Sequence, residues 1–555
     1  MSPFLRRLRI GVLLLVLLLA ACAPTVAPSA PAGETASATD EAAGPAATLR
    51  IGILGDESTL TPYTYVTGYP GWNMLMLQYD SLYQLDLEGV PQPWLVSAAS
   101  TSDDGLTITL DLKEGITWHD GEPFSAEDVK FTFEYFKQYE RSRFTRALVP
   151  VASVAAEGDT RVIITLSAPA PSFELGALAD VPIMPQHIWA EITTPEEQPF
   201  DPATNTGTGP YKLVEYAPDQ FYRFEANADY FAGAPAVNEL VFVKFADDAG
   251  SLAALRSKEI DFRTQIIPPE QIEPLAATPD MQIAQGPLYT TQMLVYDMTK
   301  PPFDRPEVRQ AMSLAIDRQD LADTIYLGAA TLGSAGWIHP ASPLFNAEVV
   351  TESDPARAQQ ILEDAGITDG DGDGVRELDG TPISFEFLVN GADSLRLRLA
   401  ELVSEMLAEV GIQANVSAVE QATWEEAVWP GFDVSQGRNY EMAMWGWSAP
   451  VQADAVRFGT LIHSDPAFGN LNLTGYANPE ADALAEAIAT EIDAAARAEM
   501  IGELQTIVAR DLPFIMLLYP DGAYAYNASI YDGWAFMTGQ GVFHKLSLLP
   551  ETARP

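Results

Sequence analysis

This chain has one cysteine, Cys22, and it stands directly after an apolar run near the N-terminus. Three arginines, Arg6, Arg7 and Arg9, precede that run, and residues 10–21 are too few to cross a bilayer stably. A basic start followed by a short apolar run is typical of a secretory signal. A single cysteine cannot form a disulfide within the chain, so the exported fold must be stabilised by packing.

The end of the apolar run, Leu19-Ala20-Ala21-Cys22, resembles the lipobox of bacterial lipoproteins. The resemblance implies that residues 1–22 hold a lipoprotein signal and that Cys22 is lipidated, which would anchor the protein to a membrane. An ordinary cleaved signal and a signal anchor are the alternatives. Residues 23–47 are mostly alanine, proline, serine, threonine and glycine, which predicts a flexible tether. No later segment is long and apolar enough to span a bilayer.

Length and charge limit the remaining possibilities. A chain of 555 residues exceeds what one hydrophobic core serves well, so two or three packed lobes are expected. With 77 acidic against 31 basic residues, the chain lacks the basic surface that nucleic acid requires. Its five histidines are widely separated, and neither H-E-x-x-H nor G-x-S-x-G occurs. A secreted glycoside hydrolase with two catalytic carboxylates is the alternative from another class.

Local patterns in the first half predict a sheet followed by a helix. Residues 106–112, LTITLDL, alternate in polarity with a period of two, which is typical of a strand. Ser125 stands three residues before Asp128, an acidic variant of the capping box that starts a helix. His119 and Asp120 could form a catalytic pair, but adjacent residues before Gly121 favour a structural turn.

The second half reads as alternating helices and strands. Helical spacing predicts one helix over residues 307–318 and another over residues 354–366, capped by aspartate at its start and glycine at its end. Residues 383–389 and 412–419 resemble strands on either side of a helix that glycine ends at position 411. Strand, helix and strand in this order favour an α/β lobe with a partly parallel sheet.

Four sequence blocks follow one another along nearly the whole mature chain. They are Tyr79 to Gly89 with Trp118-His119-Asp120-Gly121, then Gly207-Thr208-Gly209-Pro210-Tyr211, then Pro301-Pro302-Phe303-Asp304 with VRQAMSLAIDR, and then DPARAQQILEDAG from Asp354. Together they resemble the family-five extracellular solute-binding proteins. Members of that family are receptors of ABC importers for oligopeptides, dipeptides, nickel complexes and some oligosaccharides.

The resemblance implies an α/β fold, a bilobal periplasmic-binding-protein-like clamshell of the large type II class with an extra N-terminal subdomain and mixed β-sheets flanked by helices. Lobe I is expected to comprise residues 48–75, 205–293 and 515–555, the extra subdomain residues 76–204, and lobe II residues 294–514. The implied function is that of a monomeric, non-catalytic receptor that captures a peptide or other small solute between the lobes and delivers it to a membrane permease. An oligosaccharide is the alternative ligand.

The predicted ligand site centres on MAMWGWSAPVQAD, which ends at Asp454. In peptide-binding relatives an aspartate in this region pairs with the peptide amino terminus, and the aligned position here is Ser448. A buried ammonium without a carboxylate is costly, so recognition of a free amine would require Asp454 or another acid. Trp445 and Trp447 could instead offer flat apolar faces to a sugar ring or an aliphatic group, although strand alternation places at least one of them in the core.

Further aromatic residues are candidate ligand contacts, with packing between the lobes as the alternative for the first three. They are Tyr63, Tyr65 and Trp72, which we expect in one loop region together with Tyr69, and Trp424, with Trp429 and Trp337 of lower rank.

One acidic loop has calcium-like spacing. Asp369, Asp371, Asp373, the Val375 carbonyl and Glu377 could surround a hard cation with oxygen ligands. The position where an EF-hand places a bidentate glutamate is a glycine here, and a D-G-D-G turn need not bind metal. A structural calcium ion is therefore a hypothesis, and no cofactor is required.

Overall fold

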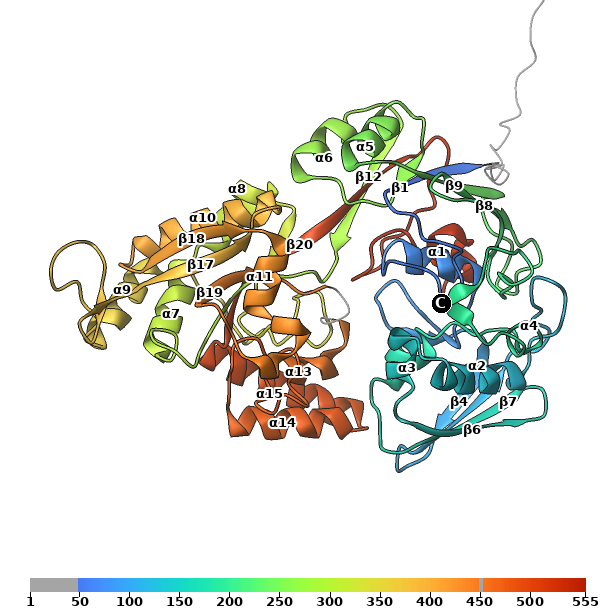
Figure 1. The fold of residues 1–555 in the computed structure, drawn as a ribbon, viewed down its shortest axis with the longest axis horizontal. Coiled ribbons are helices and arrows are strands. Elements are labelled where there is room, and N and C mark those ends of the chain that lie inside the picture. Colours follow the sequence, from blue (N-terminus) through green and yellow to red (C-terminus); the bar gives the residue numbers. More distant parts are fainter. Residues whose placement is uncertain (1–47, 449–452) are drawn as a thin grey trace, which may run out of the picture. The chain divides into compact units, whose positions relative to one another are not determined.

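The structure is a computed structural model that describes residues 48–448 and 453–555. The longest strand of this part, β20 (Phe514–Asn527), joins two portions of a continuous 12-stranded sheet, and each portion is described below as a sheet of its own (Figure 1). The half of β20 before residue 521 pairs with strands of one sheet, and the half from residue 521 onward pairs with strands of the other. We call the part built on the second sheet lobe I and the part built on the first sheet lobe II.

Lobe I has a mixed sheet in which a parallel centre is flanked by antiparallel strands. Its elements are β1 (Leu49–Ile53), β8 (Tyr211–Ala217), β9 (Phe221–Ala226), β10 (Glu239–Lys244), β11 (Phe262–Arg263), β12 (Met281–Pro287), α1 (Gly71–Gln78), α5 (Asp248–Arg256) and α6 (Pro269–Ala276). Strand β1 pairs in parallel with β10 and β11, whereas β8, β9 and β10 pair antiparallel.

The extra subdomain lies between α1 and β8 in the sequence. Its elements are β2 (Tyr83–Leu85), β3 (Pro91–Pro93), β4 (Val96–Thr101), β5 (Thr107–Leu112), β6 (Val151–Glu157), β7 (Arg161–Leu166), α2 (Ala126–Gln138), α3 (Ser142–Ala147) and α4 (Gln186–Trp189). Strands β4, β5, β7 and β6 form an antiparallel sheet, against which α2 packs. Both predictions for this part are confirmed, because β5 buries every second residue and Ser125 N–H donates to the Asp128 carboxylate at 2.9 Å before α2.

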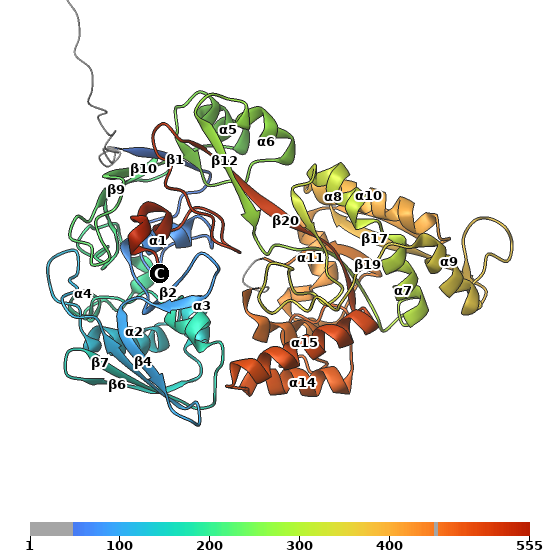
Figure 2. The same ribbon diagram turned by 180° about the vertical axis from the view of Figure 1, so that it is seen from behind.

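Lobe II has a sheet that is covered on both faces. Its elements are β13 (Gln292–Tyr296), β14 (Ala330–Leu332), β17 (Ser384–Asn390), β18 (Gln413–Val419), β19 (Met442–Trp445), α7 (Pro306–Ala315), α8 (Arg318–Tyr326), α9 (Pro355–Asp364), α10 (Ser394–Ala408), α11 (Gln421–Val428), α13 (Phe458–Ile462), α14 (Pro479–Thr490) and α15 (Ala494–Asp511). The predicted strand, helix and parallel strand are confirmed as β17, α10 and β18. In β13, Leu294 and Tyr296 face one core and Met293 and Val295 the other, as strand alternation requires. Helices α14 and α15 lie side by side over the second of these cores (Figure 2).

The helix predicted over residues 307–318 is wrong in one respect, because it is two helices. Helix α7 ends at Ala315, and Asp317 begins α8 by accepting hydrogen bonds from the N–H groups of Gln319 and Asp320. An aspartate at this place satisfies the free amides of a new helix start. The apolar spacing continues across the break, so periodicity alone does not reveal it.

His119 ties two of the four sequence blocks together and does not pair with Asp120. Its Nδ1 accepts from Gly207 N–H at 3.2 Å, and its Nε2 lies 2.9 Å from the Gly209 carbonyl, so the neutral ring carries its proton on Nε2. Burial lowers the pKa of His119 from 6.5 to about 4. Asp120 pairs with His187 instead. The preference for a structural turn over a catalytic pair therefore holds.

The C-terminal residues return to lobe I. The Lys545 ammonium donates to the Asp80 carboxylate at 2.6 Å in a fully buried ion pair, and Asn73 of α1 donates to the Phe543 carbonyl. The exact sequence boundaries given above for lobes and subdomain stay a prediction. Within residues 48–448 and 453–555, no helix combines the length and the apolar character that crossing a membrane demands.

Candidate functional site

Four tryptophans of lobe II form one group, the tryptophan cluster, which consists of Trp424, Trp429, Trp445 and Trp447. Trp445, the last residue of β19, stacks on Trp424 of α11 with ring centroids 4.4 Å apart. The Trp447 ring meets Trp445 edge-on at 5.7 Å and Trp429 at 5.5 Å. Trp445 and Trp424 are each 5% exposed, whereas Trp447 and Trp429 are half-buried. The cluster therefore has a covered end and an accessible end.

The turn from Trp445 to Trp447 is fixed by the segment that crosses between the lobes. Thr291 lies in that segment, between β12 and β13. Its Oγ1 accepts from Trp447 N–H at 2.7 Å, and its own N–H donates to the Trp447 carbonyl at 3.1 Å. A Cβ on Gly446 would collide with the Thr291 carbonyl and the Arg396 guanidinium, so glycine is required there. The cluster is thus held directly beside the crossing.

Two indole donors of the cluster have no acceptor among the residues that the structure describes. Trp424 Nε1 donates to the Met444 carbonyl at 3.1 Å. The Nε1 atoms of Trp445 and Trp429 are buried and have no hydrogen-bond partner in the part of the chain that the structure describes. A buried donor without an acceptor costs about 1–3 kcal/mol. Oxygen acceptors of a bound molecule would remove that cost.

Arg396 stands at the same place, near the start of α10. Its Nε donates to Gln292 Oε1 at 2.9 Å, and its guanidinium lies 5.8 Å from the Trp424 ring centroid. Burial lowers the pKa of Arg396, with Asp393 partly compensating. The sequence interpretation missed both Arg396 and Thr291. Thr291 is one polar residue in a connection between two strands, and Arg396 alternates with leucines in a way that singles out no residue.

The two polar residues predicted for the ligand site lie in different surroundings. Ser448 is exposed. Asp454 is half-buried, and its Oδ1 accepts from Ser172 Oγ of the extra subdomain at 2.7 Å and from Val456 N–H at 3.1 Å. Burial is the main cause of the raised pKa of Asp454. Residues 449–452, which connect these two positions, lie outside the described residues.

Tyr63, Tyr65 and Trp72 form a second aromatic group, the tyrosine cluster, which belongs to the core shared by lobe I and the extra subdomain. Tyr63 stacks on Phe136 of α2 at 5.4 Å, and Tyr65 and Trp72 both contact Phe144 of α3. Tyr63 and Tyr65 are each 5% exposed. Trp72 lies in α1, which corrects its expected place in a loop. The structure does not bring these residues to the tryptophan cluster, which belongs to a separate core.

Polar and charged neighbours complete the tyrosine cluster. The Tyr63 hydroxyl donates to the Tyr139 carbonyl at 2.6 Å, and Arg141 donates to the Tyr65 carbonyl at 2.7 Å. The Arg141 guanidinium lies 4.8 Å from the Tyr65 ring centroid. Arg143 lies 4.0 Å from the Trp72 ring centroid and pairs with Asp180. These side chains cover ring faces that a ligand would need.

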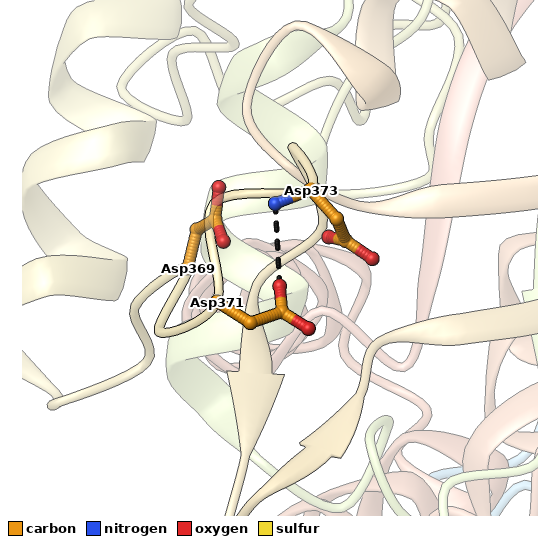
Figure 3. Close-up of side chains that lie close together, drawn as sticks. All are labelled: Asp369, Asp371 and Asp373. Carbon is orange, nitrogen blue, oxygen red and sulfur yellow. Dashed lines mark hydrogen bonds between the residues drawn. The ribbon is translucent and has the colours of Figure 1, made fainter.

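The acidic loop brings three carboxylates together at the surface (Figure 3). Ligand atoms of Asp369, Asp371 and Asp373 lie within 4.8 Å of one another, and all three residues are exposed. Asp371 accepts from Asp373 N–H at 3.2 Å, and Glu377 accepts from Gly370 N–H at 2.7 Å, so its carboxylate also turns toward the loop. The arrangement could hold a hard cation through carboxylate oxygens.

Two further candidates remain. Trp337 is fully buried in lobe II. Cys22, the predicted lipidation site, lies outside the described residues, as do the signal and the tether.

A family model described as bacterial extracellular solute-binding proteins, family 5 Middle, matches residues 90–468. The chain belongs to this family. Family-5 members are extracytoplasmic binding proteins of ABC transporters and not enzymes. The predicted receptor class and the absence of catalysis are thereby confirmed, and the glycoside hydrolase alternative is set aside.

The family-5 relatives span nearly the whole chain. The oligopeptide-binding protein AppA of Bacillus subtilis is 27% identical over 85% of this chain and 86% of its own. Its structure with a nonapeptide superimposes with a TM-score of 0.67 at 23% identity, covering 92% of this chain and 99% of AppA. The ABC transporter substrate-binding protein CtaP of Listeria monocytogenes gives a TM-score of 0.77 at 24% identity over 91% and 99%. NikA of Brucella suis with Fe(III)-EDTA gives 0.76 at 21% over 89% and 98%. The predicted bilobal α/β fold is confirmed.

Proposed function

We propose that this family-5 protein is the lipid-anchored, monomeric substrate-binding receptor of an ABC importer, and that it captures a peptide or other small solute at the tryptophan cluster for delivery to a membrane permease. The observation that carries the proposal is the pair of buried indole N–H groups of Trp445 and Trp429 that find no acceptor among the described residues, beside the crossing between the lobes. A ligand held there would touch lobe II and the crossing segment at once, so binding would couple to movement of the lobes.

A peptide is the favoured ligand, because AppA is an oligopeptide-binding protein and peptide carbonyls are acceptors for indole N–H groups. The accessible Trp447 ring supports an oligosaccharide as the alternative, since sugar rings pack against flat aromatic faces. Ser448 at the position of the relatives' amine-binding aspartate weakens recognition of a free peptide amine. Fold neighbours bind ligands as different as a nonapeptide and Fe(III)-EDTA, so the fold alone does not select among them.

Mass spectrometry of solute that co-purifies with the protein from its own host tests the ligand. We expect an intact peptide, released on denaturation. Recovery of an oligosaccharide would favour the alternative, and steady chemical conversion of the recovered solute by the purified protein would contradict a receptor.

Lipid attachment is tested separately at Cys22, because the proposal places the mature N-terminus there. We expect the N-terminal peptide to carry acyl chains and the Cys22→Ser variant to leave the membrane fraction, since one or more acyl chains supply the membrane affinity. An unmodified Cys22 in membrane-associated protein would contradict the anchor without affecting the ligand proposal.

A further inference from the structure

A hydrogen bond joins the extra subdomain to lobe II, away from the segments that connect the lobes covalently. Ser172, between β7 and the short π-helix Glu174–Leu178, donates to Asp454 Oδ1 at 2.7 Å. The same oxygen accepts from Val456 N–H and so caps the short helix Ala455–Arg457. The Asp454 carboxylate thus caps a short helix in lobe II and also accepts a hydrogen bond from a hydroxyl of the extra subdomain.

The same two parts meet again at an apolar contact. Gly105 forms the turn between β4 and β5 with a φ of +69° and is buried. A Cβ added to it would lie 2.8 Å from Ile492 Cγ2 and 3.5 Å from the Cβ of Pro169. Ile492 belongs to the connection between α14 and α15 and is 46% exposed, so it covers Gly105 with only part of its surface.

Neither contact involves the segments that join the lobes covalently. The chain crosses between them at residues 288–291 and again within β20, where pairing changes from β13 and β14 to β12 between Pro520 and Asp521. A hydrogen bond and an apolar contact can separate without disturbing that strand. Relative movement of the subdomain and lobe II would therefore break both contacts and leave the strand intact.

We propose that Ser172 and Asp454 form a latch that holds the extra subdomain against lobe II in the solute-bound state, and that Asp454 is a positioning residue for closure and not a ligand contact. The inference rests on the solute-binding function proposed above. A hydrogen bond of this kind contributes about 1 kcal/mol, which corresponds to an approximately five-fold change in the rate of solute release.

Cysteine cross-linking of the protein as isolated, with its solute bound, tests the latch without requiring that the solute be identified. Cys22 is the only native cysteine, so the double variant Ser172→Cys/Asp454→Cys adds one unambiguous pair. A bis-methanethiosulfonate reagent with a one-carbon spacer should join the two new thiols rapidly. The matched control is Thr160→Cys/Asp454→Cys. Thr160 precedes β7, and the strand separates it by about 20 Å from the end of β7 that leads to Ser172. Equal cross-linking rates for the two pairs would overturn the latch.

The rate at which each variant loses the solute it was isolated with distinguishes a role of Asp454 in closure from direct contact with the ligand. Ser172→Ala should lose that solute on dialysis about five-fold faster than the wild type. Ser167→Ala, which removes a hydroxyl bonded inside the subdomain to the Pro150 carbonyl, should change nothing. Asp454→Asn keeps an oxygen that accepts from Ser172 and should also retain the solute.

Two outcomes overturn the assignment of Asp454. If Asp454→Asn loses solute more than ten-fold faster while Ser172→Ala behaves as the wild type, the Asp454 charge contacts the ligand. If Ser172→Ala and Ser167→Ala release solute equally, the hydrogen bond has no part in closure. Absence of bound solute in the wild type would instead contradict the proposed function, and the cross-linking result would stand by itself.

Discussion

The tyrosine cluster and the tryptophan cluster look alike in the sequence, since each gathers several aromatic residues within a short stretch. They differ in what their polar atoms do. The Tyr63 hydroxyl has a carbonyl partner, and two arginines cover the Tyr65 and Trp72 rings. In the tryptophan cluster, two buried indole donors lack partners among the described residues and the Trp447 ring is partly accessible. Aromatic density therefore indicates a cluster, and an accessible ring beside unpaired donors indicates which cluster can meet a ligand. An unpaired donor alone does not, because Trp189 Nε1, fully buried beside Tyr63, also has no hydrogen-bond partner among the described residues.

The largest effect that follows from this comparison concerns stability. Tyr63→Ala should lower the free energy of unfolding by about 3–5 kcal/mol, because it leaves a cavity in a filled core. Trp447→Ala should lower it by about 1 kcal/mol, because part of that side chain is already accessible. Urea denaturation followed by circular dichroism measures both. Equal losses would erase the distinction between the two clusters.

Satisfied polar atoms should also make lobe I sensitive to acid. Neutral His119 accepts from Gly207 N–H, and a second ring proton would face that donor. Its pKa is about 4 when folded against 6.5 for the free group, so the unfolded chain takes up the proton first. Stability from this residue is complete above pH 6.5 and is lost as the pH falls toward 4. Well inside that window the slope is about 1.4 kcal/mol per pH unit.

The variant His119→Gln isolates this contribution, because the glutamine amide can keep one acceptor and one donor without titrating. The slope of the free energy of unfolding against pH between 6.5 and 4 should fall by about 1.4 kcal/mol per pH unit, which corresponds to the uptake of one proton fewer on unfolding. His339 and His544 have pKa values lowered to about 4 by burial as well, so part of the slope should remain. An unchanged slope would show that the ring is solvated during acid titration.

For the ligand, the comparison predicts that affinity depends on the tryptophan cluster. Trp447→Ala should weaken binding of the co-purified solute at least ten-fold, about 1.4 kcal/mol, because the accessible aromatic face is lost. Trp189→Phe, in the core beside Tyr63, should leave affinity unchanged. Isothermal titration of stripped protein measures both variants. If Trp445→Ala and Trp447→Ala together left affinity unchanged, the site would lie elsewhere.

The sequence predicted those features that local chemistry determines. The capping box at Ser125 and the aspartate cap at Asp354 are confirmed, since each signal involves residues within one helical turn. Strand alternation also predicted a core position for one tryptophan, and Trp445 occupies it. The break at Asp317 was missed because the apolar spacing runs through it.

Features that depend on distant parts of the chain could not be predicted. Thr291, just before β13, and Arg396 of α10 reach the tryptophan cluster through sheet pairing and helix packing, which no local pattern encodes. Tyr63 could not be recognised as a core residue, because its coverage comes from Phe136 and Trp189 of another segment. Burial and hydrogen-bond satisfaction are therefore the observations that separate a predicted ligand contact from a packing residue.

In the acidic loop, too, the atoms that already have hydrogen-bond partners can be told from those that could meet a ligand. The stabilisation expected from a ligand is smallest here. Both Asp369 oxygens already accept backbone N–H groups, whereas Asp371 and Asp373 each use one oxygen. The free oxygens could still bind calcium, and sites of this kind in extracellular modules bind at about 0.1–1 mM. At 1 mM calcium the expected stabilisation is about 0.4–1.4 kcal/mol. Thermal unfolding in 1 mM calcium and in excess chelator should then differ for the wild type but not for Asp371→Asn/Asp373→Asn. Coincident wild-type curves would mean that backbone amides alone organise the loop.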